Sequence, residues 1–136
     1  MTETDMRTFD TGATRNQDDT KLDGEGFYSP IVVERFAQYL HKHRKQADGK
    51  VRDSDNWQKG MPKAVYIKSA WRHFLEWWKA HRGFPTSETI EDSICALIFN
   101  AQGYLFELLK EKQKVTLVQV KMPDNDPALL GGLRSS

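Results

Sequence analysis

Cysteine and long apolar segments are scarce in this chain of 136 residues, which has a single cysteine, Cys95. One thiol can form neither an intrachain disulfide nor a thiolate cage around a metal ion. No apolar run approaches the roughly 18 residues that a membrane-spanning helix needs. We therefore expect a protein of a reducing, cytoplasmic compartment that has no membrane partner.

An excess of one charge is also missing, because 20 Lys and Arg residues face 19 Asp and Glu residues and leave a net charge of +1. Phosphate-backbone contacts and polybasic membrane anchors usually need a basic excess, so we expect no nucleic-acid partner. The common glycine-rich phosphate loops, the G-x-S-x-G nucleophile turn and the H-E-x-x-H zinc motif are absent as well. Their absence argues against P-loop, dinucleotide-binding, serine-hydrolase and zinc-protease chemistry.

Apolar and aromatic side chains, by contrast, recur at helical spacing in three segments. Residues 30–46, residues 62–83 and the residues from Glu88 onward each place apolar side chains on one face. The third pattern continues for more than five turns, about 30 Å. Three main amphipathic helices joined by short connections predict an all-α bundle.

The expected buried faces follow from this spacing. They are Ile31, Val32, Phe36, Tyr39 and Leu40 in the first helix, Val65, Ala70, Trp71, Phe74, Leu75 and Trp78 in the second, and Ile90, Ile94, Leu97, Ile98, Ala101, Leu105 and Leu108 in the third.

Residues 1–28 are polar and lack periodicity, which predicts an irregular arm. The helical domain is expected over residues 29–112. In residues 113–136, the alternating VTLVQV at 115–120 predicts a short strand or an oligomer-forming edge, followed by a loose tail.

Carboxylates cluster at the start of the third helix, in the sequence SETIEDSICALIFNAQ. Glu88, Asp92 and Asn100 are spaced by multiples of four and form one stripe, with Glu91 beside it. Acids in a first helical turn complement the helix dipole, which is sufficient to explain Glu88 and Glu91. Facing carboxylates are also favourable when a cation such as Mg²⁺ or Mn²⁺ lies between them. The residues alone leave both interpretations open.

Histidines and cations on the other two helices also have two interpretations each. His73 and Glu76 lie one turn apart on the second helix. Such pairs occur in di-iron bundles, but a single pair favours a hydrogen-bonded surface contact. The basic cluster from His41 to Arg44 is typical of a solvated helix end, or of a corner that binds phosphate.

The loop DSDNWQKGMP, residues 53–62, is either a turn whose Trp57 packs in the core or a ligand-binding loop. Together with GATR at 12–15, KLD at 21–23, SPIVVERFAQYLHKHR at 29–44, WRHF at 71–74 and EDSICALIFNAQGYL at 91–105, it resembles a known family. That family is the phage-associated one described as dATP/dGTP diphosphohydrolase N-terminal, a group of MazG-like nucleotide pyrophosphohydrolases. The resemblance covers about residues 8–110.

The resemblance implies an all-α fold that is completed by homo-oligomerisation, as a dimer or tetramer, with active sites between helices of neighbouring subunits. It implies two or three Mg²⁺ or Mn²⁺ ions per site. The implied reaction is hydrolysis of a purine (d)NTP, with dGTP or GTP preferred, to (d)NMP and pyrophosphate. Such an enzyme, if phage-encoded, would act on this small-molecule nucleotide in the host cytoplasm.

In the family, an E-x-x-E helix and an E-x-x-D helix hold the metal ions. Here the second helix has HFLE at 73–76, in which only Glu76 matches the E-x-x-E pattern. The third helix has ETIE at 88–91 followed by Asp92, so it supplies acidic residues but departs from E-x-x-D. The resemblance implies that the catalytic residues are Glu76, Glu91 and Asp92, and that the metal ligands are Glu34, Glu76, Glu88, Glu91 and Asp92. The implied substrate contacts are Asn56, Trp57, Lys59, Arg72, His73, Asn100, His41, Lys42, Arg15 and Lys21.

Two other functions are compatible with parts of the sequence. One is a non-enzymatic helical module that binds protein or nucleic acid through the aromatic second helix and the basic loop. The other, a dinuclear iron or manganese oxidoreductase, requires more histidine ligands than the three helices supply.

Overall fold

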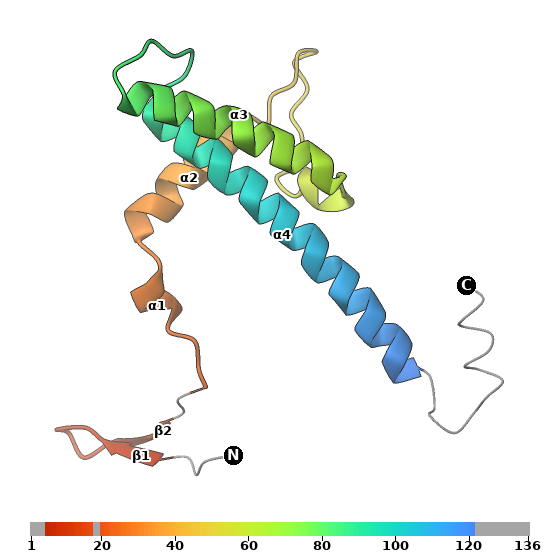
Figure 1. Cartoon of the computed structure of the whole chain (residues 1–136). Helices are drawn as coiled ribbons and strands as arrows, with labels where there is room; N and C mark the ends of the chain where they lie inside the picture. The colour runs from red at the N-terminus through yellow and green to blue at the C-terminus, as the bar shows by residue number, and fades with distance from the viewer. Residues whose placement is uncertain (1–4, 18–19, 122–136) are drawn as a thin grey trace. The chain divides into compact units, whose positions relative to one another are not determined.

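The computed structural model of the chain describes residues 5–17 and 20–121. Its elements, in chain order, are β1 (Asp5–Thr8), β2 (Thr14–Gln17), α1 (Gly24–Phe27), α2 (Pro30–Lys42), the 3-10 helix η1 (Asn56–Lys59), α3 (Lys63–His81) and α4 (Ile90–Lys121). Helices make up most of the described chain and its sheet has two strands, so the predicted all-α class is confirmed (Figure 1). The chain divides into two compact units, residues 1–34 and residues 35–136.

The first unit contains a β-hairpin, in which β1 and β2 pair antiparallel with Arg7 opposite Arg15. A tight turn closes it, because the Gly12 N–H donates to the Phe9 carbonyl (2.8 Å) and Gly12 has a φ of +84°, which favours glycine. The irregular arm expected over residues 1–28 is therefore wrong for this hairpin. Both strands, DMRT and TRNQ, are mainly polar, so no apolar alternation marks them in the sequence.

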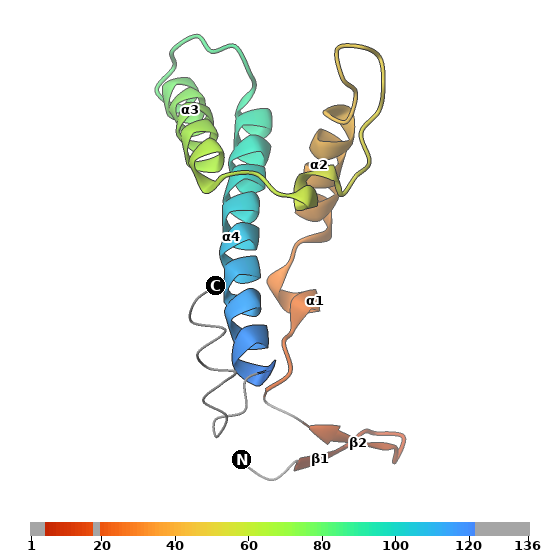
Figure 2. The ribbon, with the colours of Figure 1, turned by 90° about the vertical axis from the view of Figure 1, so that its right-hand side faces the viewer.

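In the second unit, α3 and α4 lie side by side and run in opposite directions (Figures 1 and 2). The ring of Tyr66 on α3 lies directly over Gly103 on α4, and a Cβ atom at position 103 would overlap that ring. The buried residues of α4 nearer its start are small or of medium size, namely Ser93, Cys95, Ala96 and Asn100. Small side chains on α4 therefore allow the two helix backbones to approach closely.

The turn between α3 and α4 is fixed by a glycine and a threonine. Gly83 (φ +84°) follows the end of α3, and Phe84 N–H donates back to the Lys79 carbonyl at 2.9 Å. Thr89 Oγ1 accepts from the Asp92 N–H at 3.1 Å and so caps α4. The predicted helix start at Glu88 is wrong by two residues, because the Thr86 and Ser87 hydroxyls donate to Glu88 O and to Glu76 instead.

Two other predicted boundaries are also wrong. Helix α2 ends at Lys42 rather than at residue 46, because the chain then folds into a turn. Helix α4 continues to Lys121, so residues 115–120 are helical and the predicted strand is wrong. Lengthening a formed helix adds one hydrogen bond per residue, which outweighs the modest helix penalty of Val and Thr. The predicted tail after Lys121 lies outside the described residues.

The apolar faces predicted for the helices are only partly buried in the single chain. Among the residues that the structure describes, the fully buried apolar side chains are Tyr66, Cys95 and Ala96. Several residues of the predicted core are exposed instead, namely Ile31, Val32, Val65, Trp71, Phe74, Trp78, Ile90, Ala101 and Leu105. The closest part of the contact between α3 and α4 uses a small residue of α4, Gly103, and many large apolar side chains lie beside it. Within the described part, no helix is both long and apolar enough to cross a membrane.

The close contact at Gly103 predicts the direction in which a Gly-to-Ala substitution changes the free energy of unfolding. Gly103→Ala should lower the free energy of unfolding by roughly 1–3 kcal/mol, because the new methyl group displaces the Tyr66 ring. The same change at an open helical site would raise stability by up to about 1 kcal/mol. Urea unfolding followed by circular dichroism measures the difference. In a Tyr66→Ala background the substitution should become neutral or stabilising, and equal destabilisation in both backgrounds would contradict the contact.

Candidate functional site

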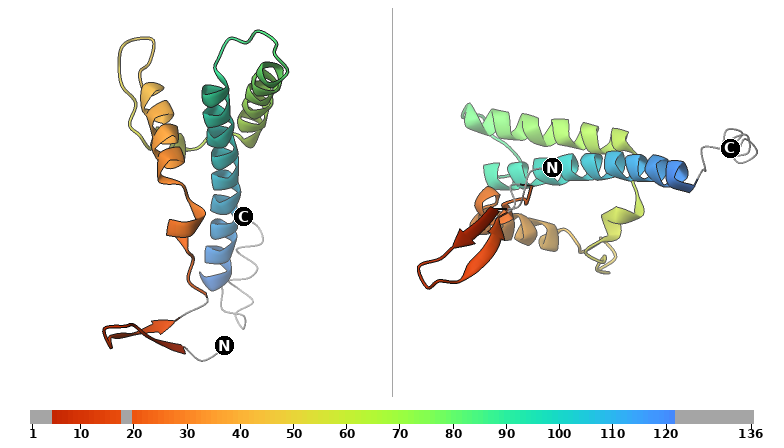
Figure 3. Two further views of the ribbon diagram at one scale, coloured as in Figure 1. Left: turned by 90° about the vertical axis from the view of Figure 1, so that its left-hand side faces the viewer. Right: turned by 90° about the horizontal axis from the view of Figure 1, so that it is seen from below.

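A hollow of about 420 Å³ lies in the second unit, and we call it the central pocket. Its walls come from the end of α2, the connection that follows it, η1, α3 and α4. Helix α4 lies between α3 and the second half of α2 in perpendicular views (Figures 2 and 3). Segments that are distant in the sequence therefore meet at this one cavity.

The connection after α2 brings two arginines to the pocket wall. Lys45 and Val51 form an antiparallel bridge, and the turn between them is closed around Gly49 (φ +84°). Next to the bridge, the Arg52 N–H donates to the Arg44 carbonyl at 2.9 Å, and Arg44 Nε donates to the Arg52 carbonyl at 2.8 Å. Both arginines line the pocket. The turn thus fixes the guanidinium group of Arg44 and brings the backbone of Arg52 next to it, although the two residues lie eight apart in the sequence.

The loop DSDNWQKGMP forms η1, and Trp57 in it has two roles. Its indole packs edge-on against Phe99 (centroids 6.0 Å apart) and Phe106 (4.9 Å) of α4. The same residue and its neighbour Asn56 line the pocket, and Trp57 is only partly buried. The two interpretations of this loop are therefore compatible, since α4 anchors an indole that also faces the cavity.

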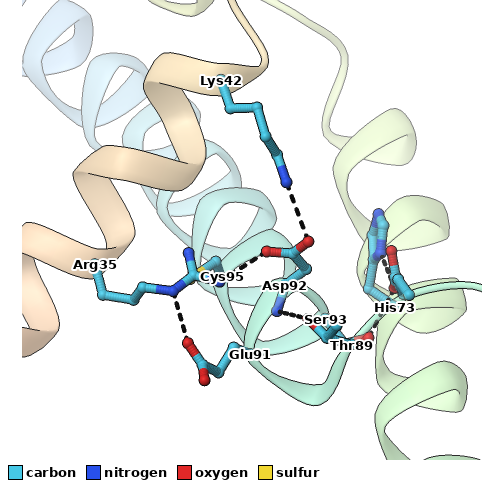
Figure 4. A network of polar contacts seen from close by, with 9 residues as sticks. Arg35, Lys42, His73, Thr89, Glu91, Asp92, Ser93 and Cys95 are labelled. Atoms are coloured by element: carbon cyan, nitrogen blue, oxygen red, sulfur yellow. Dashed lines mark hydrogen bonds and ion pairs between the residues drawn. The ribbon is translucent and has the colours of Figure 1, made fainter.

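Helix α3 contributes Arg72 and His73 to the pocket. His73 Nδ1 lies 2.7 Å from Glu88 Oε1, which also accepts a hydrogen bond from Ser93 Oγ at 2.8 Å. This pair fixes the imidazole beside the start of α4 (Figure 4). Since Nδ1 is engaged, Nε2 is the ring nitrogen that remains for a ligand.

Two further side chains offer neutral hydrogen-bonding groups. Asn100 is buried, and its Nδ2 donates to the Ala96 carbonyl at 2.8 Å, so its Oδ1 remains an acceptor. Burial, with the charges of Glu88 and Asp92, raises the pKa of Tyr39 to about 12. Tyr39 is therefore a neutral hydroxyl donor at physiological pH. A cavity with such groups can recognise a donor and acceptor pattern.

The charge of the pocket wall is positive. Three guanidinium groups line it, from Arg44, Arg52 and Arg72, against the single carboxylate of Asp53. Desolvation, followed by the charge of Lys42, lowers the pKa of the pocket residue His43, so this imidazole is neutral near pH 7. Guanidinium groups around a cavity favour an anionic ligand.

The acids predicted to be catalytic on α4 are occupied by cations of α2. Arg35 Nε pairs with Glu91 (2.7 Å) and its Nη2 pairs with Asp92 (2.8 Å), while Lys42 Nζ pairs with the other oxygen of Asp92 at 3.2 Å (Figure 4). The hydrogen bond from Arg35, then that from Lys42, lowers the pKa of Asp92. Glu91 and Asp92 do not line the pocket. In the single chain they connect α2 to α4.

The other predicted metal ligands are not gathered around one point. Among the described residues, no group of three or more His, Cys, Asp and Glu side chains is arranged to hold a metal ion. Glu76 accepts from Ser87 Oγ at 3.1 Å, and its second oxygen is buried without a hydrogen-bond partner in the structure described here. Glu88 faces His73, and Glu34 belongs to the first unit. An unpartnered buried carboxylate oxygen is a group that fits a cation.

The structure brings five of the predicted substrate contacts to the pocket, namely Asn56, Trp57, Arg72, His73 and Asn100. The others lie elsewhere. Lys59 and His41 are exposed outside the pocket wall, Lys42 pairs with Asp92, and Arg15 and Lys21 belong to the first unit.

The sequence analysis missed Arg52 and placed Tyr39 only on the buried face of the first helix. Arg44 was considered only as part of the basic cluster from His41 to Arg44, either a solvated helix end or a phosphate-binding corner. The available signal was the ADG turn at residues 47–49, flanked on both sides by basic residues. Such a turn returns the chain on itself and brings the flanking cations together.

Comparisons of this chain with models of protein families, with curated proteins and with solved structures found no match.

The ion pairs of Asp92 give a pH-dependent prediction. Asp92→Asn should lower the midpoint of thermal unfolding by a few degrees near pH 7, because Arg35 and Lys42 lose their shared acceptor. The folded pKa of Asp92 lies below 3.8, so the ion-pair contribution is complete above that pH. It is lost as the pH falls through the lowered pKa, and the wild type and variant should then converge. Asp10→Asn, which removes an exposed carboxylate of the first unit, is the control and should show no such convergence. A difference that persists unchanged to low pH would contradict the ion-pair assignment.

Proposed function

We propose that the central pocket binds a purine nucleoside triphosphate and that the protein is a metal-dependent nucleotide pyrophosphohydrolase. The proposed reaction converts a (d)NTP, with dGTP or GTP preferred, to (d)NMP and pyrophosphate. The observation that carries the proposal is the lining of the pocket, where three arginines meet aromatic rings and amide groups. The choice of reaction follows the resemblance to MazG-like enzymes that the sequence motifs suggest.

The arginines suit the phosphates of such a ligand. A triphosphate carries several negative charges, and guanidinium groups bind phosphate oxygens in a bidentate manner. The Arg44 side chain is held by the Arg52 carbonyl, Arg52 lies beside it in the same turn, and Arg72 belongs to α3. Positive charge on two sides of the cavity can position the triphosphate and stabilise the charge that develops on departing pyrophosphate.

The aromatic and amide groups suit the base. Trp57, held against Phe99 and Phe106, offers an indole that can stack on a purine. Asn56 and the acceptor oxygen of Asn100 can form hydrogen bonds to the base edge. Discrimination between guanine and adenine depends on such polar groups, since both bases have similar apolar area.

Divalent metal would be held by carboxylates at the start of α4 and on the facing turn of α3. Glu76 has a buried oxygen without a partner in the described structure, and Glu88 uses only one of its two oxygens. Glu91 and Asp92 can join them where the ion pairs to Arg35 and Lys42 open. When bound, Mg²⁺ or Mn²⁺ neutralises the triphosphate and acidifies the attacking water.

His73 is a side chain of the pocket that can hold a proton during the proposed reaction. Its Nδ1 is fixed by Glu88, and its Nε2 is the nitrogen available to a ligand. A histidine oriented in this way can accept a proton from water or donate one to a phosphate oxygen. The role of Glu88 is then to position the imidazole.

A screen of the eight common (d)NTPs tests the reaction directly. With Mg²⁺ or Mn²⁺ we expect pyrophosphate and a nucleoside monophosphate from purine substrates, because attack at the α-phosphorus releases the β- and γ-phosphates together. Glu76→Gln should abolish most turnover and should also remove the thermal shift caused by Mn²⁺ alone. The control Glu111→Gln alters an acid that pairs with Lys63 and should retain both. Release of orthophosphate would contradict the reaction class.

Substitution of the pocket arginines tests the binding site independently of turnover. Arg52→Ala and Arg72→Ala should each weaken binding of dGTP by about tenfold or more, because each removes a charge-assisted phosphate contact. Isothermal titration with Mn²⁺ present measures the effect. The matched control is Arg82→Ala, since Arg82 stacks over Trp78 outside the pocket. Equal affinity in all three variants would place the nucleotide elsewhere. If the wild type also shows no nucleotide binding, a non-enzymatic binding module becomes the better account.

A further inference from the structure

The second half of α2, residues 35–42, forms part of the wall of the central pocket but is not packed against its neighbours as α3 and α4 are. Tyr39 and Leu40 line the cavity from this segment. No residue of α2 is buried. In the described chain, every Cα atom of residues 35–42 lies farther than 8 Å from the Cα atoms of α3 and α4, whereas those two helices pack directly. Side-chain contacts therefore hold this part of the wall in place.

Three ion pairs attach the segment to the start of α4. Arg35 pairs through Nε with Glu91 (2.7 Å) and through Nη2 with Asp92 (2.8 Å), and Lys42 Nζ pairs with the second oxygen of Asp92 at 3.2 Å (Figure 4). Arg35 and Lys42 are about two helical turns apart, so both project from one face of α2. We call these ion pairs the clasp. With a hydrogen bond from Arg35 to Cys95, they are the polar contacts of α2 side chains with the other helices in the part of the chain that the structure describes.

The clasp is exposed enough to open. The exposed fractions of the Lys42 and Glu91 side chains are 61% and 73%, and that of Arg35 is 35%. Ion pairs at such positions contribute modestly to stability and are weakened further by salt. By contrast, α3 and α4 are fixed to each other by the close contact of Tyr66 and Gly103. We therefore expect α2 to separate from α4 while α3 and α4 stay together.

Cys95 on α4 lies behind the clasp. Its exposed fraction is 5%, and Arg35 Nη1 donates a hydrogen bond to its Sγ at 3.8 Å. Cys95 follows Asp92 by about one helical turn, so both face the same segment of α2. Burial raises the pKa of the Cys95 thiol, which keeps it protonated and unreactive while it is covered. Separation of α2 from α4 would uncover this thiol.

We propose that the second half of α2 is a movable wall of the central pocket, which the clasp holds against α4 and whose displacement opens the cavity. The opposite wall keeps its shape, because Arg72, His73 and Asn100 belong to α3 and α4. A ligand would thus enter from the side of α2 and be enclosed when the ion pairs form again. The proposal concerns access to the cavity and does not depend on which ligand the cavity binds.

Alkylation by iodoacetamide measures this displacement in the full chain, because Cys95 is its single cysteine. At low ionic strength the wild type should react slowly. Lys42→Gln removes one ion pair of the clasp and should speed the reaction about two- to fivefold, the range expected for an exposed ion pair. Loss of the charge alone would slow it, since burial raises the pKa of the Cys95 thiol and the Lys42 charge lowers it. Unchanged or slower alkylation of Lys42→Gln would overturn the proposal.

Two control variants separate this opening from a general loss of stability. Lys63→Gln removes the ion pair of Lys63 with Glu111 (2.7 Å) between α3 and α4, and it should be alkylated at the wild-type rate. Lys42→Arg keeps the charge of the clasp and should also retain that rate. Circular dichroism should show the same helix content in all variants. Equal acceleration in Lys42→Gln and Lys63→Gln would contradict the proposal, because the thiol would then react through unfolding of the whole unit.

Salt provides a second measurement on the unaltered chain. In about 1 M NaCl the screening length falls to about 3 Å, so the clasp should weaken and the wild type should be alkylated faster. The acceleration should be smaller in Lys42→Gln, which has fewer ion pairs to lose, and smallest when Arg35→Gln is combined with Lys42→Gln. If salt speeds the reaction of the wild type and of the double variant equally, the clasp does not hold the wall.

Discussion

The contact between Tyr66 and Gly103 is the constraint on which the second unit depends. The ring occupies the space that a Cβ atom would need, so α3 and α4 approach closely at this one place. Near the start of α4 the buried residues are small or of medium size, such as Ser93 and Ala96, and Tyr66 also packs edge-on against Phe99 with ring centroids 6.2 Å apart. Many large side chains of both helices lie beside the contact. They form an exposed apolar surface of α3 and α4 on one side and help to enclose the central pocket on the other.

The walls of the central pocket outside α3 and α4 come partly from two short segments, η1 and the turn between Arg44 and Arg52. Trp57 anchors η1 to α4 through two aromatic contacts, and the hydrogen-bonded turn brings Arg44 and Arg52 together at the pocket wall. Arg35 and Lys42 connect α2 to Asp92. Asp92, which we propose as a metal ligand, is thus paired with protein cations in the single chain. Binding of metal and opening of these ion pairs would be linked.

The sequence predicts the helices well where a local signal marks their ends. Pro30, Pro62 and Gly83 lie within two residues of helix ends because their backbone preferences act locally. The burial of the helix faces is predicted less well, because periodicity shows that a face is apolar but does not show what covers it. Trp71 and Phe74 are apolar-face residues that face solvent in one chain. The role of Arg52 depends on a turn that brings it next to Arg44, which spacing along the chain does not reveal.

Hydrogen–deuterium exchange of the wild type, with and without dGTP and Mn²⁺, tests most directly whether the central pocket is the nucleotide site. The account predicts slower exchange in the turn around Arg44 and Arg52, in η1, and in α3 near Arg72, since a bound nucleotide would order these segments. The hairpin of β1 and β2 should serve as an internal reference that changes little. Slower exchange confined to that hairpin, or no change in the pocket segments at saturating nucleotide, would contradict the account.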